Sequence, residues 1–121
     1  MFIKDDPLQF FDFFKNIQHD SFLIAENCFP IQKFHLQPIK RNIDSKEIEF
    51  LAIKNILIFE EKRNQGTFSK FIFPLIDNLN FNICFDDIVN DRLFSFLIKN
   101  NYQPLFYMKN NYDFRAAYKI K

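Results

Sequence analysis

Residues 47–79, EIEFLAIKNILIFEEKRNQGTFSKFIFPLIDNL, decide the fold that this sequence predicts. The first part, Glu47–Phe59, is rich in strand-forming residues whose apolar and polar side chains alternate, and the phase slips near Lys54-Asn55, as at a β-bulge. A charged stretch ends at Gly66. Apolar residues then recur at helical spacing through Thr67–Leu79, where Pro74 should kink the helix or end it early. The segment therefore predicts a long strand, a short turn and a helix.

Shorter elements are expected on both sides of this segment. Before it we expect a helix over Asp6–Gln18, strands over Ser21–Ala25 and Ile31–Ile39 joined by a turn at Asn27–Pro30, and a polar loop over Lys40–Lys46. After it we expect a strand over Asn80–Phe85, a helix over Asn90–Asn100, and a hairpin of Gln103–Lys109 and Tyr112–Ile120 that turns at Asn110-Asn111. These elements predict one α+β domain over residues 1–121. Its sheet should be mixed, mostly antiparallel and twisted, with about three helices and one strand–helix–strand crossover.

Composition limits the classes of function. The formal net charge of +1 in 121 residues argues against a nucleic-acid-binding protein. No run of apolar residues is long enough to cross a bilayer, and no targeting signal is visible, so we expect a cytoplasmic protein with no membrane partner. Cys28 and Cys84 lie in apolar surroundings and are expected to be reduced, buried thiols. Two His and two Cys spread along the chain predict no metal site.

Gly66 is the only glycine in the chain, and it lies between the predicted strand and helix. A glycine at such a point supplies a positive φ angle or lets the backbone approach another group closely. Helix N-termini carry unpaired backbone N–H groups, and Lys62, Arg63 and Lys70 add positive charge beside this one. The segment is therefore a candidate phosphate site, although a plain turn residue in a solvated loop explains the same pattern.

The segment Ile56–Phe68 resembles the acyl-CoA-binding motif of the GNAT family of N-acetyltransferases. In that motif a long strand leads to Arg or Gln, then to Gly three residues later, and then into a helix; Arg63 and Gly66 match, whereas Phe68 replaces a small residue. A later family segment, in which an Asn starts a helix that ends in Gly-Phe or Gly-Tyr, resembles Asn90–Tyr102, with Asn101 in place of Gly. The resemblance covers roughly Glu47–Pro104.

The resemblance implies a GNAT-like fold with a shortened N-terminus and acetyl-CoA as the bound substrate. The backbone around Gly66 would hold the pyrophosphate, the strand before it would pair with the pantetheine arm, and Asn90 would hold the pantetheine or a water. The residues implied in cofactor binding are Ile56, Ile58, Lys62, Arg63, Asn64, Gln65, Gly66, Thr67, Phe68 and Asn90.

The resemblance leaves the catalytic groups open. In the family a Tyr seven residues after the Asn often protonates the leaving thiolate, but Leu97 stands there, so Tyr102, Tyr107 or solvent would have to serve. For the general base, Glu49 lies where the family often places one. The other carboxylates considered are Glu47, Glu60, and Asp86 or Asp87, and each could equally be a solvated surface group. His35 alternates with apolar neighbours and is expected on the outer face of its strand.

Two functions follow as hypotheses. The first is acetyl transfer from acetyl-CoA to an amine acceptor, a small molecule or a protein, by direct attack on the thioester; a short N-terminus would leave an open groove that suits a protein or peptide. The second is a catalytically weak or inactive GNAT-like module that binds a protein partner. The Phe-rich stretch Phe10–Phe14 could form a partner or subunit surface, including that of a homodimer.

Overall fold

The computed structural model describes residues 2–4, 12, 16–18, 22–28, 31–58 and 66–121. These residues form a sheet of seven strands in the order β1-β2-β3-β4-β5-β7-β6. The strands are β1 (Phe2–Lys4), β2 (Leu23–Cys28), β3 (Ile31–Ile43), β4 (Lys46–Ile58), β5 (Ile83–Phe85), β6 (Gln103–Lys109) and β7 (Tyr112–Lys119). The helices are η2 (Phe68–Ile72), α2 (Phe73–Asp77) and α3 (Asp91–Lys99). The helix expected over Asp6–Gln18 lies largely outside the described residues.

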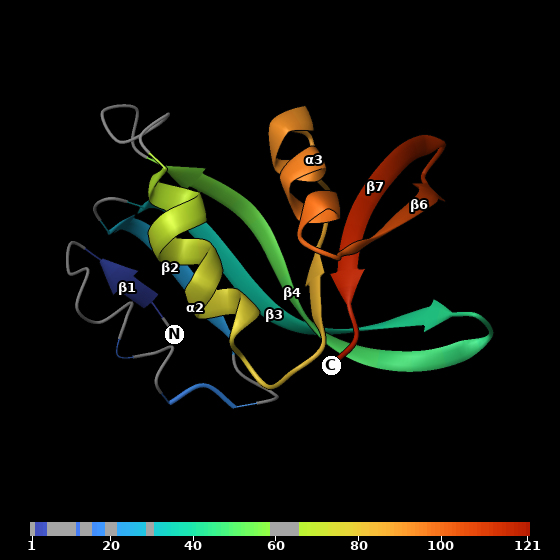
Figure 1. Ribbon diagram of the computed structural model, residues 1–121, viewed down its shortest axis with the longest axis horizontal. Helices are drawn as coiled ribbons and strands as arrows, with labels where there is room; N and C mark the ends of the chain where they lie inside the picture. The colour runs from blue at the N-terminus through green and yellow to red at the C-terminus, as the bar shows by residue number, and fades with distance from the viewer. Residues whose placement is uncertain (1, 5–11, 13–15, 19–21, 29–30, 59–65) are drawn as a thin grey trace.

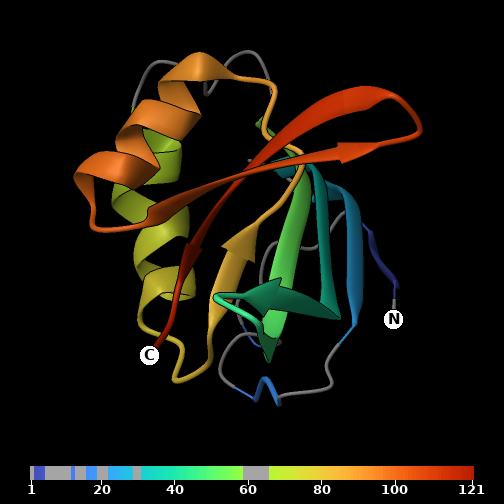
Figure 2. The same cartoon turned by 90° about the vertical axis from the view of Figure 1, so that its right-hand side faces the viewer.

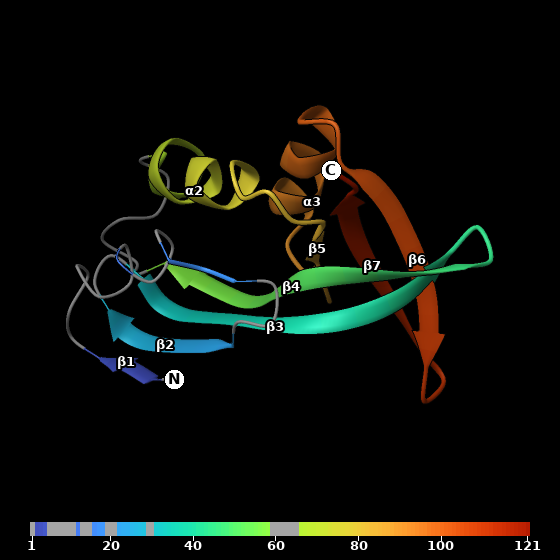
Figure 3. The ribbon, with the colours of Figure 1, turned by 90° about the horizontal axis from the view of Figure 1, so that it is seen from below.

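The sheet is mostly antiparallel, and only the pairs β1–β2 and β4–β5 run parallel. The chain crosses from β4 to β5 through η2 and α2, and from β5 to the C-terminal hairpin through α3. Both helical segments cover the same face of the sheet (Figures 1 and 2). The hairpin of β6 and β7 crosses to the opposite side of the sheet (Figure 3). The predicted α+β class and mostly antiparallel sheet are thus confirmed.

The β3–β4 hairpin differs most from the sequence-based expectation. The polar loop predicted over Lys40–Lys46 is wrong, because both strands run for 13 residues and only Asp44 and Ser45 turn, with φ angles of 50° and 66°. Ile39, Arg41 and Ile43 continue the alternation of β3, and Ile43 is buried. Lys40 and Asn42, the polar residues between them, are exposed on the other face of the strand, as the period of two requires.

The helix after Gly66 contains the irregularity expected from Pro74. Its first part is a π-helical turn in which the Phe73 N–H donates to the Phe68 carbonyl, and an α-helix then runs over Phe73–Asp77. Pro74 stands in the first turn of that α-helix, where a missing N–H donor costs little. The wider π turn thus lets the chain pass a proline, and the helix ends at Asp77, two residues before the predicted Leu79.

Two hydrophobic clusters pack on the two faces of the sheet. The larger one lies under the helices and is rich in aromatic rings: Phe73, Phe85 and Tyr102 have ring centroids 5.5–6.4 Å apart. The smaller one, Ile43, Phe50, Cys84 and Ala116, packs where the C-terminal hairpin faces the β3–β4 hairpin. The buried residues of the larger cluster are Phe34, Leu36, Leu51, Ile53, Ile72, Phe73, Ile76, Leu79, Ile83, Phe85, Ile88, Leu97, Tyr102 and Ala117.

Several C-terminal predictions are confirmed. Asn90 is the N-cap of α3, and its side chain accepts a hydrogen bond from the Leu93 N–H (3.0 Å). Asn110 and Asn111 turn the last hairpin with φ angles of 53° and 65°. The strand expected over Asn80–Phe85 is shorter, since β5 spans only Ile83–Phe85. β1 was not expected, because its parallel partner β2 is about twenty residues away in the sequence.

Candidate functional site

The parallel strands β4 and β5, which are neighbours near the middle of the sheet, separate from each other after a short stretch of pairing. They pair over only three residues each, Leu51–Ile53 with Ile83–Phe85, and the last rung is the Asp86 N–H donating to the Ile53 carbonyl (2.9 Å). Beyond this rung β4 continues to Ile58, whereas β5 has ended. Within the described residues, β4 therefore has no strand partner on that side past Ile53.

The residues that follow the last rung bend both strands. Asn55 on β4 has φ 54°, and Asp87 after β5 has φ 51°, a region that residues other than glycine rarely adopt. At Asn55 the β3–β4 register shifts, which confirms the predicted bulge. The Asn55 amide Nδ2 also lies 3.0 Å from His35 Nδ1, on the outer strand face expected for His35. Each strand thus turns away from the other at a left-handed residue.

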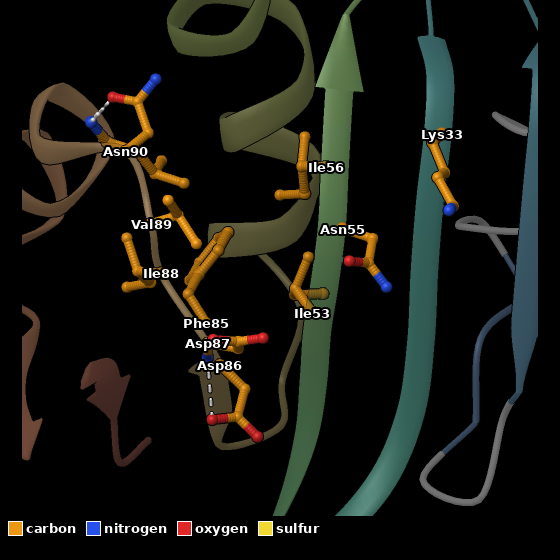
Figure 4. A pocket seen from close by; sticks show the side chains of 11 residues that line it. Lys33, Ile53, Asn55, Ile56, Phe85, Asp86, Asp87, Ile88, Val89 and Asn90 are labelled. Carbon is orange, nitrogen blue, oxygen red and sulfur yellow. Dashed lines mark hydrogen bonds between the residues drawn. The ribbon is translucent and has the colours of Figure 1, made fainter. Parts of the chain in front are cut away.

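A cleft of about 280 Å³ fills the space between the diverging strands (Figure 4). Most of its wall is apolar, and its polar groups stand at the strand ends and at the start of α3. The residues that line it are Lys33, Ile53, Asn55, Ile56, Phe85, Asp86, Asp87, Ile88, Val89, Asn90 and Leu93. Two residues of the predicted cofactor-binding set, Ile56 and Asn90, are therefore brought together here from β4 and from the N-terminus of α3.

Asp86 is held firmly below the cleft. Its side chain is 1% exposed, and its Oδ1 accepts hydrogen bonds from the Tyr107 hydroxyl (2.6 Å) and from the Asp87 N–H (2.9 Å). Its Oδ2 accepts a hydrogen bond from Arg41, and Lys54 Nζ lies 3.7 Å away. Two cations from β3 and β4 and a hydroxyl from β6 thus surround one buried carboxylate.

This network changes the acidity of its members. Burial lowers the pKa of Arg41, but the charge and hydrogen bond of Asp86 outweigh burial, so the pKa is raised. Burial and the hydrogen bond to Asp86 raise the pKa of Tyr107. Burial, with the charge of Asp86, raises the pKa of the Cys84 thiol to about 12. A Tyr hydroxyl with a raised pKa that already donates to a carboxylate is a poor proton donor for a thiolate.

The three predicted catalytic residues are not brought together. Glu49 is exposed on β4, about 13 Å along the strand from Ile53, and it does not line the cleft. Tyr102 is buried in the larger cluster, its hydroxyl donates to Asp77 Oδ1 (3.1 Å), and burial and Asp77 raise its pKa. Tyr107 faces the opposite side of the sheet. Leu97 is a fully buried core residue.

Gly66, the first described residue after β4, has the positive φ angle that was expected of it, 75°. Its carbonyl accepts the Lys70 N–H (2.8 Å), so the helical hydrogen bonds begin there. Phe68 packs in the aromatic core, with its ring centroid 5.7 Å from Phe96. Thr67 is buried as well. The predicted residues Lys62, Arg63, Asn64 and Gln65, and the candidate base Glu60, lie outside the described residues, and the side chain of Ile58 is not described.

Sequence reasoning missed Arg41 and Lys54 as partners of Asp86. Arg41 stands 45 residues from Asp86 in the sequence, so no local pattern connects them. One signal was present: Arg41 lies between Ile39 and Ile43 in an alternating run, which places a charge on the apolar face of a strand. Such a charge requires a partner, because an unpaired buried cation is costly.

Three further observations complete the description of the site. Within the described residues, no group of three or more His, Cys, Asp or Glu side chains is arranged to hold a metal ion. No helix in that part of the chain is long and apolar enough to span a membrane. In comparisons with known proteins, no family model, no curated protein and no solved structure matches the chain.

Proposed function

We propose that the chain binds an acyl-CoA, acetyl-CoA in the simplest case, in the cleft between β4 and β5, and transfers its acyl group to an amine. The observation that carries this proposal is the parting of the parallel β4–β5 pair after the Ile53–Asp86 rung. A cleft between strands offers backbone N–H and C=O groups on one side and apolar side chains around them. The pantetheine arm carries two amides and can pair with such a strand edge as another strand would.

The arrangement around the cleft supports the same assignment. β4 leads to Gly66 with its positive φ angle and then to a helix, the order in which the GNAT-like motif requires them. Asn90 starts α3 and lines the cleft, as the second motif implies. β5 is parallel to β4, and β7 lies between β5 and β6, so one crossover and one terminal hairpin flank the cleft.

The chemistry requires three things at the closed end of the cleft: a donor to the thioester oxygen, an acceptor for the amine proton and a source of the proton for the thiolate. Backbone N–H groups of β4 beyond Ile53 are suited to the first task. For the third task, Leu97 stands where the family often has a Tyr, and a leucine cannot supply a proton. The acceptor amine would then react with a cofactor held by backbone groups rather than by charged side chains.

Calorimetric titration with acetyl-CoA tests this proposal. Val89 lines the cleft and is 84% exposed, so Val89→Trp should obstruct the cleft without disturbing the core, and Val89→Ala should leave it open. We expect binding by the wild type and by Val89→Ala, and at least tenfold weaker binding by Val89→Trp. A Gly66→Trp variant should also lose binding. Asn tolerates a positive φ angle, so a Gly66→Asn variant shows whether such a loss comes from the bulk of the new side chain or from strain in the backbone. A folded wild-type protein that binds no acetyl-CoA would refute the proposal.

The second candidate is a GNAT-like module that binds a protein partner without transfer. It is favoured by buried Leu97 and by Tyr102 and Tyr107, neither of which lines the cleft. Exposed apolar side chains on the C-terminal hairpin, Phe106 (68%) and Met108 (70%), are suited to a protein contact. Affinity capture by the wild type that is lost in a Phe106→Ser/Met108→Ser variant, together with failure to bind acetyl-CoA, would favour this reading.

A further inference from the structure

Asp87 is the exposed carboxylate at the closed end of the cleft. It follows the last rung between the two strands directly, and its side chain extends into the gap toward β4 (Figure 4). We propose that Asp87 takes the proton from the attacking amine and returns it to the leaving thiolate, and that Asp86 holds it in position. This inference rests on the proposed acyl transfer.

The geometry of the cleft places the reacting atoms beside Asp87. A pantetheine arm that lies along β4 can advance only to the Ile53–Asp86 rung, where the strands close to hydrogen-bonding distance (2.9 Å). The thioester at the end of the arm therefore stops within reach of the first residue after that rung. Glu49, the carboxylate favoured by the resemblance, lies on the far side of the same rung.

Asp86 is unsuited to the same task. Its two oxygens already accept hydrogen bonds from Tyr107, Asp87 and Arg41, and Lys54 Nζ lies 3.7 Å from Oδ2. A carboxylate whose two oxygens are already engaged in hydrogen bonds within the protein is poorly placed to accept one from a substrate amine. Its side chain is 1% exposed, so no substrate reaches it directly.

Asp86 instead fixes the backbone of Asp87. The hydrogen bond from the Asp87 N–H to Asp86 Oδ1 (2.9 Å) holds the peptide between them while Asp87 adopts its φ angle of 51°. Such a conformation costs free energy and persists only where neighbouring contacts enforce it. The contacts here come from β3, β4 and β6 through Arg41, Lys54 and Tyr107. Asp86 is accordingly a positioning residue, and Asp87 is the proposed catalytic residue.

The proton balance of the step is complete. The amine nitrogen forms a bond to the thioester carbon, and its proton passes to the Asp87 carboxylate as that bond forms. The C–S bond then breaks, and the protonated Asp87 gives the same proton to the sulfur. The products are an amide and the free thiol of CoA, and Asp87 is again ionised. One residue thereby serves the two proton transfers, and no Tyr is needed where Leu97 stands.

The test compares Asp87→Asn and Asp87→Ala with the wild type and with Asp113→Asn, which removes an exposed carboxylate on β7. Binding of acetyl-CoA is measured by calorimetry. Release of CoA thiol is measured with three probe amines, ethanolamine, spermidine and a lysine-containing peptide, with and without added formate. We expect Asp87→Asn to bind acetyl-CoA with a Kd within about twofold of the wild-type value. It should release thiol at about one hundredth of the wild-type rate or below. Formate, a small carboxylate, should restore part of the rate in Asp87→Ala only.

The outcomes separate the two proposals. A wild type that binds no acetyl-CoA refutes the proposed function and this inference with it. A wild type that binds acetyl-CoA but transfers to no probe amine, or an Asp87→Asn variant as fast as the wild type, refutes the role of Asp87 alone. An Asp87→Ala variant that is slow but unaffected by formate also refutes the proton transfer, because a merely structural defect is not repaired by a free carboxylate. An Asp86→Asn variant that lowers the rate without changing the acetyl-CoA affinity supports the positioning role.

Discussion

Tyr107 provides the hydroxyl that completes the buried Asp86 network. A hydrogen bond to a charged group contributes more than a neutral one, and this one is 2.6 Å long. We expect Tyr107→Phe to lower the free energy of unfolding by about 1–2 kcal/mol, measured by urea denaturation. Tyr112→Phe is the matched control, because Tyr112 is 70% exposed and should have no measurable effect. Equal stabilities of the two variants would show that the network contributes nothing.

Asp77 should make the stability of the protein sensitive to acid. Burial raises its pKa, but hydrogen bonds from Lys119 (3.0 Å) and Tyr102 (3.1 Å) and the nearby lysine charges outweigh burial, so the pKa is lowered. A carboxyl whose pKa is lower in the folded state stabilises the fold above its unfolded pKa of about 4, and this contribution is lost as the pH falls below that value.

The corresponding experiment is urea unfolding of Asp77→Asn and wild type at two pH values. At pH 7 the variant should be less stable by about 1 kcal/mol, and the difference should shrink near pH 3, below the unfolded pKa, because the unfolded chain then binds a proton at Asp77 more readily than the folded chain does. Asp113→Asn serves as the exposed control. A difference that stays constant with pH would contradict the role assigned to the ionised carboxylate.

At the scale of elements, Asn90 stabilises the start of α3 through its N-cap hydrogen bond to Leu93. Asn90→Ala should destabilise the protein by about 1 kcal/mol, whereas Asn90→Ser or Asn90→Asp should retain most of the stability. Thermal unfolding followed by circular dichroism measures this. If Asn90→Asp is as stable as the wild type but binds acetyl-CoA more weakly, the side chain serves the cleft as well as the helix; a full loss of stability in every variant would contradict the capping role.

The elements that the sequence predicted well are those whose ends carry a local chemical signal. Asn90 predicted the start of α3, Asn110-Asn111 the last turn, and the phase slip at Asn55 the bulge in β4. The prediction failed where charged residues continue a strand: Lys40–Ile43 read as a loop because their polarity outweighed the alternation. β1 could not be predicted at all, since a three-residue strand is stable only through its distant partner.

For the candidate site, the sequence could suggest candidate residues but not the face of the sheet on which each residue lies. Ile56 and Asn90, two residues of the predicted cofactor-binding set, line the cleft. A phenol can replace the missing donor, which favours Tyr102 and Tyr107 in the sequence, but their burial and their partners Asp77 and Asp86 are long-range consequences of packing. The role proposed for Asp87 depends on where β5 stops pairing with β4, and this register joins residues about thirty positions apart in the sequence.

At the scale of the whole molecule, Cys84 is covered from both sides of the sheet. The residue lies on the central strand β5 and is fully buried, and its pKa of about 12 keeps the thiol protonated at neutral pH. A thiol reagent should therefore reach it only when the whole fold opens, because the helices cover one face and the C-terminal hairpin the other. In a Cys28→Ala background, Cys84 should react at least about 1,000-fold more slowly than in the urea-unfolded chain.

The same thiol then reports cofactor binding without an acceptor. If acetyl-CoA binds the folded state alone, it lowers the population of the unfolded state by a factor of one plus the ratio of its concentration to the Kd. At a concentration about 100 times the Kd, labelling of Cys84 should slow about 100-fold. Val89→Trp should label at the wild-type rate without acetyl-CoA and show little slowing with it. Slowing that is equal in both proteins would place the bound cofactor outside the β4–β5 cleft, because Val89 lines that cleft and a Trp side chain there would obstruct it.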